Sequence, residues 1–166
     1  MKVIKAKTAG FCFGVKRAVD TVYKQVDTKC GQIYTYGPII HNEEVIKDMR
    51  DKGVIVLRSE EDLDMISQGT VIIRSHGVEK RIYEKIEQKG LRIVDATCPF
   101  VKKIHNIVSE KSGEGFHIII IGNPEHPEVV GIKGWAKDNV TVIQSAEDAE
   151  CFTADRKEKI CIVSQT

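Results

Sequence analysis

Short runs of β-branched and aromatic residues alternate along the chain with segments whose apolar positions recur at helical spacing. Ile82, Tyr83 and Ile86 show that helical spacing within residues 79–89,. We predict strands at residues 2–7, 32–36, 54–57, 70–74, 91–94, 116–121, 140–143 and 159–163, with helices at residues 15–26, 43–52 and 79–89. Strands joined by crossover helices predict an α/β protein with parallel sheets that are covered on both faces.

The pattern occurs twice in the chain. Gly-Pro-Ile-Ile-His-Asn-Glu at residues 37–43 and Gly-Asn-Pro-Glu-His-Pro-Glu at residues 122–128 each precede a helix, and similar strand and helix segments follow both. In this register His41 corresponds to His126 and His76 to Thr166. The repeat predicts two related α/β units, and a chance similarity between two ordinary β-α-β segments is the alternative interpretation.

Two cysteines follow the same repeat. Cys12 lies 29 residues before His41, and Cys98 lies 28 residues before His126. The first unit continues from His76 to Cys98, so the second is expected to continue beyond Thr166 to another cysteine. We therefore expect the chain to be part of a longer protein.

Composition and charge exclude several classes of function. The 166 residues carry a net charge of +1 with acids and bases interleaved, so there is no basic stripe for a nucleic-acid backbone,. The N-terminal residues form no apolar signal region, and the apolar run at residues 118–121 is far too short to cross a bilayer,. Five widely spaced cysteines in such a chain favour a reducing compartment,. We expect a cytoplasmic protein without a nucleic-acid or membrane partner.

Cys12 and Cys98 share a local context that suits a metal ligand. Each directly precedes a predicted helix, where the positive end of the helix dipole and free amide groups stabilise a thiolate. Thr97 is a candidate N-cap for the second of these helices, and Pro99 suits its first position,. Each cysteine taken alone fits a buried small hydrophobic residue equally well, but their matched context favours a cluster or metal role.

The other cysteines and two of the histidines lack such a context. Cys30 lies in a polar turn, Cys151 ends a short amphipathic segment, and Cys161 alternates within a strand, so we predict structural roles for all three. His105 lies inside a predicted helix and His117 at a strand start, and neither receives a functional role.

His41, His76 and His126 lie on loops that follow predicted strands. In parallel α/β folds such loops converge on one side, where ligands bind. Metal binding, proton transfer and anion binding are all open to histidine, and anion binding is favoured because no carboxylate stands at zinc-ligand spacing and helix N-termini lie nearby. Glu128 lies on the same stretch as His126, and is either a proton donor or simply an acid at a helix start.

Five motifs together resemble one known family, the 4-hydroxy-3-methylbut-2-enyl diphosphate reductases. They are Ala-Gly-Phe-Cys-Phe-Gly-Val at residues 9–15, Gly-Pro-Ile-Ile-His-Asn at 37–42, Arg-Ser-His-Gly at 74–77, Asp-Ala-Thr-Cys-Pro at 95–99 and Gly-Asn-Pro-Glu-His-Pro-Glu at 122–128. The resemblance implies pseudo-repeated three-layer αβα units with parallel sheets around a central cluster site, the third unit missing here. It divides the chain into an N-terminal strand and first cluster loop (1–13), which packs on the absent third unit in the family, a first α/β unit (14–96) and an incomplete second unit (97–166).

The resemblance also implies a site. Cys12 and Cys98 match two of the three cysteines that hold a 4Fe-4S cluster, and the third is absent from this chain. Three residues match those that bind the substrate diphosphate, Glu128 matches the acid that supplies protons, and Thr166 belongs to a Ser-Gln-Thr stretch similar to another substrate-facing motif. The three diphosphate-binding matches are His41, His76 and His126.

The implied reaction is a reductive dehydroxylation that yields isopentenyl and dimethylallyl diphosphate, with electrons from a ferredoxin- or flavodoxin-type protein. For the chain by itself, which is expected to be inactive, the alternative is a non-catalytic diphosphate-binding module without a stable cluster. A zinc hydrolase is a third hypothesis.

Overall fold

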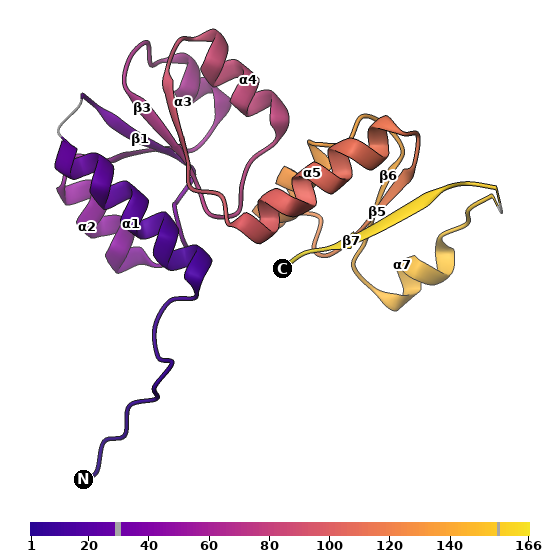
Figure 1. The fold of residues 1–166 in the computed structure, drawn as a ribbon, viewed down its shortest axis with the longest axis horizontal. Coiled ribbons are helices and arrows are strands. Elements are labelled where there is room, and N and C mark those ends of the chain that lie inside the picture. Colours follow the sequence, from indigo (N-terminus) through magenta and orange to yellow (C-terminus); the bar gives the residue numbers. More distant parts are fainter. Residues whose placement is uncertain (29–30, 156) are drawn as a thin grey trace.

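Two parallel β-sheets organise the chain. The computed structural model describes residues 1–28, 31–155 and 157–166. The first sheet has the order β2-β1-β3-β4 and the second the order β6-β5-β7, with every pairing parallel (Figure 1). The strands are β1 (Ile33–Tyr36), β2 (Ile55–Leu57), β3 (Thr70–Ile73), β4 (Arg92–Asp95), β5 (His117–Ile121), β6 (Val140–Ile143) and β7 (Ile160–Ser164). The predicted α/β class with parallel sheets is confirmed.

Helices cover both faces of the first sheet. Helix α1 (Phe13–Thr28) and α2 (Glu43–Asp51) pack on one face, where Ile72 of β3 joins Val22 and Met49. Helix α3 (Glu60–Asp64) and α4 (Lys80–Gln88) pack on the other face. Because side chains alternate along a strand, Val71 and Ile73 face this second cluster while Ile72 faces the first,.

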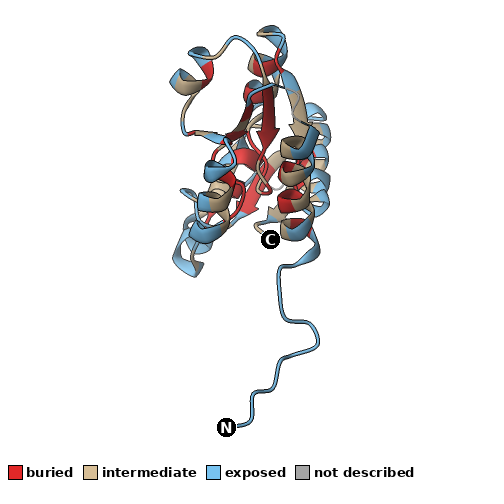
Figure 2. Cartoon of the chain, turned by 90° about the vertical axis from the view of Figure 1, so that its left-hand side faces the viewer, coloured by how far each residue is buried: buried red, intermediate tan, exposed pale blue. Residues whose placement is uncertain are grey.

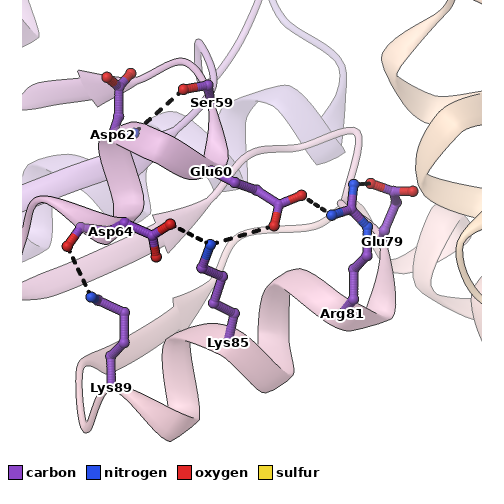
Figure 3. Close-up of polar contacts among 8 residues, drawn as sticks. All are labelled: Ser59, Glu60, Asp62, Asp64, Glu79, Arg81, Lys85 and Lys89. Atoms are coloured by element: carbon purple, nitrogen blue, oxygen red, sulfur yellow. Dashed lines mark hydrogen bonds and ion pairs between the residues drawn. The ribbon is translucent and has the colours of Figure 1, made fainter.

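Salt bridges join the two helices α3 and α4 along their exposed edge (Figure 3). Glu60 pairs with Arg81 and with Lys85, and Lys85 also reaches Asp64 at 2.8 Å. Single exposed pairs stabilise proteins little, but a connected network holds several side chains in place at once. The network therefore supplements the apolar packing that fixes α4 on the sheet.

The second sheet has one compact core. Helix α5 (Pro99–Gly113) and α6 (Pro127–Lys133) pack on the face that carries Ile118 and Ile120. The short helix α7 (Ala146–Cys151) follows β6 as α3 follows β2, but it contains no buried residue. The two sheets thus share their strand order and crossover pattern, as the sequence repeat predicted, and they differ in how well their faces are covered.

The structure corrects the register of that repeat at its end. Tyr36 pairs with Ile73 in the first sheet, and Ile121 pairs with Ser164 in the second. Tyr36 and Ile121 are equivalent, because each directly precedes the glycine that begins its repeated motif. Ile73 therefore corresponds to Ser164, and Thr166 takes the place of Ser75. The predicted correspondence of His76 with Thr166 is therefore wrong by one residue. A shift of one residue along a strand turns its side chains to the opposite face of the sheet, and only the corrected register places the core-facing residues of the two units at equivalent positions.

The predicted strand at residues 2–7 is not formed. Residues 1–10 are exposed, and the segment extends away from α1 (Figure 2). A strand requires a partner for its backbone hydrogen bonds, and none of the described strands pairs with this segment,. Alternating sequence is therefore insufficient here to produce a strand. Among the described residues, no helix is long and apolar enough to cross a membrane.

Candidate functional site

A tight junction between the two units brings their loops together. The Trp135 indole donates a hydrogen bond to the Val78 carbonyl at 2.9 Å, and the Lys80 amide donates to the Gly134 carbonyl at 3.4 Å. A Cβ atom at Gly131 of α6 would lie 3.6 Å from the backbone of Val78, so the two backbones nearly touch. The loop after β3 is thereby held against α6.

Three histidines from both units converge at this junction. The ring centroids of His41 and His76 lie 4.9 Å apart, those of His76 and His126 5.5 Å, and those of His41 and His126 6.4 Å. One nitrogen from each ring lies within 4.8 Å of the others. His41 and His76 come from loops after β1 and β3, while His126 comes from the loop after β5. The structure thus assembles the three histidines singled out from the sequence.

Burial and mutual repulsion keep His76 neutral. Loss of hydration lowers the pKa of His76 to about 4, and the positive charges of His41, Arg74 and His126 act in the same direction,. Near neutral pH, this imidazole therefore carries one proton and offers one donor and one acceptor. An anion bound here would favour the protonated ring and raise its pKa.

The hydrogen bond at the start of α6 determines which nitrogen of His126 carries a proton. His126 is the N-cap, and its Nδ1 accepts the Glu128 amide proton at 3.2 Å. In the neutral ring the proton must then sit on Nε2, which becomes a donor. Nε2 can bind a metal ion only when it carries no proton, so this arrangement favours an anion over a metal ion.

Glu128 is a buried acid held by Thr166. Glu128 is 3% exposed, and its carboxylate accepts hydrogen bonds from the Thr166 amide at 2.7 Å and from the Thr166 hydroxyl at 2.9 Å. These bonds fix the orientation of the carboxylate two residues after His126. The junction therefore places a buried, oriented carboxyl group on the same loop-to-helix segment as His126.

Cys98 lies directly against the start of α1. A Cβ atom at Gly14 would lie 2.7 Å from Cys98 Sγ, and Cys12 precedes Gly14 by two residues. Arg17 of α1 reinforces the contact by donating to the Thr97 carbonyl at 2.8 Å. Cys12 is exposed and Cys98 partly buried. The fold therefore brings together the two helix starts that carry these thiols.

The local prediction around Cys98 needs one correction. Cys98 itself is the N-cap of α5, so the predicted N-cap at Thr97 is wrong. Instead, the Thr97 amide donates to the Asp95 side chain at 3.0 Å and its hydroxyl pairs with Tyr83 at 3.2 Å. Pro99 occupies the first turn as predicted.

The remaining cysteines have different surroundings. Cys161 is partly buried against the second core, consistent with its predicted structural role. Cys151 is exposed, so its predicted structural role is wrong, because α7 buries none of its residues. The prediction for Cys30 lies outside the described residues.

Two groups near the site are not evident from the sequence. His105, which received no role, is 1% exposed and stacks on Trp135 with ring centroids 5.1 Å apart. Arg74 packs against Gly37, whose backbone has a φ of 73°. Gly37 and Arg74 both stand within the motifs described above, but nothing in the linear sequence indicates that they touch.

Comparisons with known proteins identify the family. The family model described as LytB protein matches residues 3–166. The chain belongs to the LytB family.

Curated relatives of this LytB chain share one name. The 4-hydroxy-3-methylbut-2-enyl diphosphate reductase of Caldanaerobacter subterraneus subsp. tengcongensis is 47% identical over 167 residues, covering 100% of this chain and 57% of that protein. The protein of the same name from Clostridioides difficile is 44% identical, with 100% and 59% covered. The LytB chain thus spans less than two thirds of the length of these relatives.

Solved structures agree with this assignment. The E-1-hydroxy-2-methyl-but-2-enyl-4-diphosphate reductase from Plasmodium falciparum superposes with a TM-score of 0.90 at 32% identity, covering 96% of this chain and 50% of that chain. A second structure, (E)-4-hydroxy-3-methyl-but-2-enyl diphosphate reductase, gives a TM-score of 0.81 at 38% identity, covering 99% and 58%. The LytB fold of the chain is therefore that of known reductases.

Proposed function

We propose that this LytB chain forms the diphosphate-binding and proton-donating part of a 4-hydroxy-3-methylbut-2-enyl diphosphate reductase. The observation that carries the proposal is the convergence of His41, His76 and His126 beside the buried carboxyl of Glu128. The reaction replaces the allylic hydroxyl by hydrogen. Two electrons and two protons enter, the carbon–oxygen bond breaks, and water leaves with isopentenyl and dimethylallyl diphosphate as products.

The histidine cluster holds the substrate diphosphate in this proposal. His126 donates from Nε2, since its Nδ1 is already an acceptor for the Glu128 amide. His76 enters as a neutral ring whose pKa of about 4 rises when the anion binds, so binding takes up protons,. The cluster thereby combines hydrogen-bond donors with a positive charge that forms on His76 when the anion binds.

Glu128 supplies a proton to the departing hydroxyl oxygen. Its burial excludes bulk water, and Thr166 directs its two oxygens by hydrogen bonds of 2.7 and 2.9 Å. Thr166, which we also place at the substrate, acts by positioning this carboxyl group. A general acid of this kind typically accelerates a reaction by about 10²–10⁴-fold.

Cys12 and Cys98 are proposed as two ligands of a 4Fe-4S cluster. Thiolates are the ligands that such clusters require, and the contact of Cys98 with Gly14 places both cysteines at adjacent helix starts,. When bound, the cluster would supply electrons singly and a Lewis-acidic iron for the hydroxyl oxygen. Two cysteines are too few for the cluster, so a third cysteine ligand is part of the proposal.

The division into residues 1–13, 14–96 and 97–166 is supported by the separate cores around the two sheets. We place the protein in the cytoplasm, with a ferredoxin- or flavodoxin-type electron donor.

Anaerobic reconstitution with iron and sulfide tests the proposal. The complete protein is expected to turn brown, to contain four irons and four sulfides, and to reduce the diphosphate substrate. Cys98→Ser should remove the cluster and the activity, whereas the matched control Cys161→Ser, in the strand β7, should retain both. A colourless complete protein that still binds the diphosphate would favour the non-catalytic binding module, and stoichiometric zinc would favour a hydrolase.

A further inference from the structure

A second cationic cavity lies on the first unit. It has a volume of about 600 Å³ and is bordered by α2, the end of β2 and the loops after β1 and β3. We call it the arginine pocket and define it by Lys47, Arg50, Arg58 and Arg74. We propose that the arginine pocket binds a small phosphorylated molecule, at a site distinct from the three-histidine cluster.

The position of the pocket in the fold is typical of ligand sites. Gly37 directly follows β1, Arg58 follows β2, and Arg74 follows β3. In the order β2-β1-β3-β4, strand β2 lies on one side of β1, and β3 and β4 lie on the other. The chain therefore reverses its direction across the sheet at β1. Parallel α/β sheets bind ligands at the carboxyl ends of strands, at such a point of reversal.

The charges around the pocket are not balanced. Four basic side chains face two acidic ones, Glu43 and Glu44, which leaves a formal excess of two positive charges. Among the described residues, no ion pair engages any of the four basic side chains. By contrast, the basic residues of α4 pair with nearby acids (Figure 3). Cations left without partners around a concavity attract an anion.

Arg74 is the anchor of the pocket. Its guanidinium packs on Gly37, where any Cβ atom would collide with Nη1, and its Nε donates to the Gly77 carbonyl at 3.3 Å. Burial lowers the pKa of Arg74 from its usual value, because removing the charged guanidinium from water costs free energy,. An arginine stays charged under these conditions, so a bound anion would offset that cost. The guanidinium is thus held in place before any ligand arrives.

The chemistry of the pocket selects a phosphate group on a small molecule. Guanidinium groups bind phosphate oxygens through two parallel hydrogen bonds, and three of the four cations are arginines,. The volume lies within the range of about 300–1,000 Å³ that small-molecule sites occupy. A concavity of this size encloses a small ligand, whereas a docked protein would cover a broader surface.

The pocket and the histidine cluster share two loops. None of the three histidines borders the pocket, but Gly37 lies four residues before His41 and Arg74 two residues before His76. A ligand that displaces Arg74 would therefore shift His76 through the Gly77 hydrogen bond. Occupation of the arginine pocket is expected to change the affinity of the histidine cluster for its anion.

Calorimetric titration of the 166-residue chain with inorganic pyrophosphate tests the proposal. We expect two classes of site. Arg50→Gln combined with Arg58→Gln should weaken one class at least tenfold and leave the other, while His41→Asn combined with His76→Asn should do the reverse. Because each variant retains one site, the surviving site also shows that the variant is folded.

A charge-matched control separates local from general electrostatics. Lys24→Gln combined with Arg92→Gln removes two positive charges outside the pocket and should leave both sites intact. One class of site in the unaltered chain, or an equal loss in this control, would overturn the arginine pocket as a ligand site. Unchanged pyrophosphate binding in the arginine variant would also overturn it, and weaker binding of an acidic ferredoxin by that variant would instead identify a protein-docking surface. The histidine variant tests the histidine cluster separately, so a failure of the arginine pocket is distinguishable from a failure of the proposed function.

Discussion

Strands β3 and β7 occupy equivalent places in the two units and have very different surroundings. All four residues of β3 are buried, whereas exposed and partly buried residues alternate along β7. In the corrected register Val71 corresponds to Ile162, and these residues are 0% and 65% exposed. The same β-α-β pattern therefore gives a full core in one unit and a half-covered sheet in the other.

The difference lies in what packs on the outer face. In the first unit, α4 follows β3 and contributes Ile82 and Ile86 to the cluster around Val71, and β4 covers the edge of β3. In the second unit the short helix α7 buries none of its residues, and β7 is an edge strand among the described residues. A strand sequence specifies two faces, but neighbouring elements decide whether both are buried.

The acids at equivalent helix starts differ in the opposite sense. Glu43 at the start of α2 is exposed, while Glu128 near the start of α6 is 3% exposed and bound by Thr166. The better covered unit thus carries the solvated acid, and the less covered unit the buried one. Substitutions that distinguish the two units make this comparison testable.

The largest effect is expected at Glu128. Glu128→Gln in the complete protein should lower kcat about 100-fold or more, because the amide keeps the shape but cannot donate an acidic proton. Steady-state reductase kinetics measure the change. Glu125→Gln on the same loop is the control and should leave kcat unchanged, since its side chain is exposed. Equal activities of the two variants would exclude Glu128 as the acid.

Core truncation should next separate β3 from β7. Val71→Ala is expected to reduce the free energy of unfolding by about 2.5 kcal/mol, through lost burial and a residual cavity. Ile162→Ala removes more carbon but should cost less than about 0.5 kcal/mol, because the side chain is already in water. Urea denaturation of both variants gives the comparison, and a larger loss at Ile162 would contradict the exposure of β7.

Acid should weaken the junction between the units through His105. Burial lowers the pKa of His105 to about 4, with Asp95 opposing the shift and Lys102 adding to it. The unfolded chain binds the proton more readily below the ordinary pKa of 6.5, so stability falls as the pH drops from 6.5 towards 4,. Between pH 7 and pH 5 the loss from this group is about 2 kcal/mol.

The variant His105→Phe isolates that contribution. It keeps a ring beside Trp135 but has no titrating nitrogen, so its unfolding free energy should depend less on pH than that of the unaltered chain. Denaturation at pH 7 and pH 5 measures both slopes. Parallel slopes would show that His105 does not titrate on unfolding.

The smallest effects are expected at the helix caps. Ser59 caps α3 and Ser145 caps α7 in the same way, each by accepting a backbone amide proton. Ser59→Ala should cost about 1 kcal/mol because α3 carries the buried Leu63,. Ser145→Ala should cost less than about 0.5 kcal/mol of global stability, since α7 buries none of its residues and is expected to open locally,. Thermal unfolding and hydrogen exchange at α7 distinguish these outcomes.

Much of the fold follows from local sequence. Seven of the strands form close to their predicted positions, and Pro99 and the serine caps mark helix starts by their own chemistry. The segment at residues 2–7 shows the limit, because alternation creates a potential strand that remains unpaired among the described residues. The alignment of the two repeats also matched Thr166 with His76 when its structural counterpart is Ser75. Such an alignment compares residue positions and does not consider which face of the sheet each side chain occupies.

The sequence by itself determined the alternation of strands and helices, the two repeated units and the loops on which the histidines and the two cysteines stand. Only the tertiary structure decided which of these groups meet. The Trp135 indole donates a hydrogen bond to Val78 at the junction beside the histidine cluster. Thr166 donates to Glu128, and Arg74 packs on Gly37. Such contacts join residues far apart in the chain, so they depend on how the units pack, which no local pattern of hydrophobic and polar residues encodes.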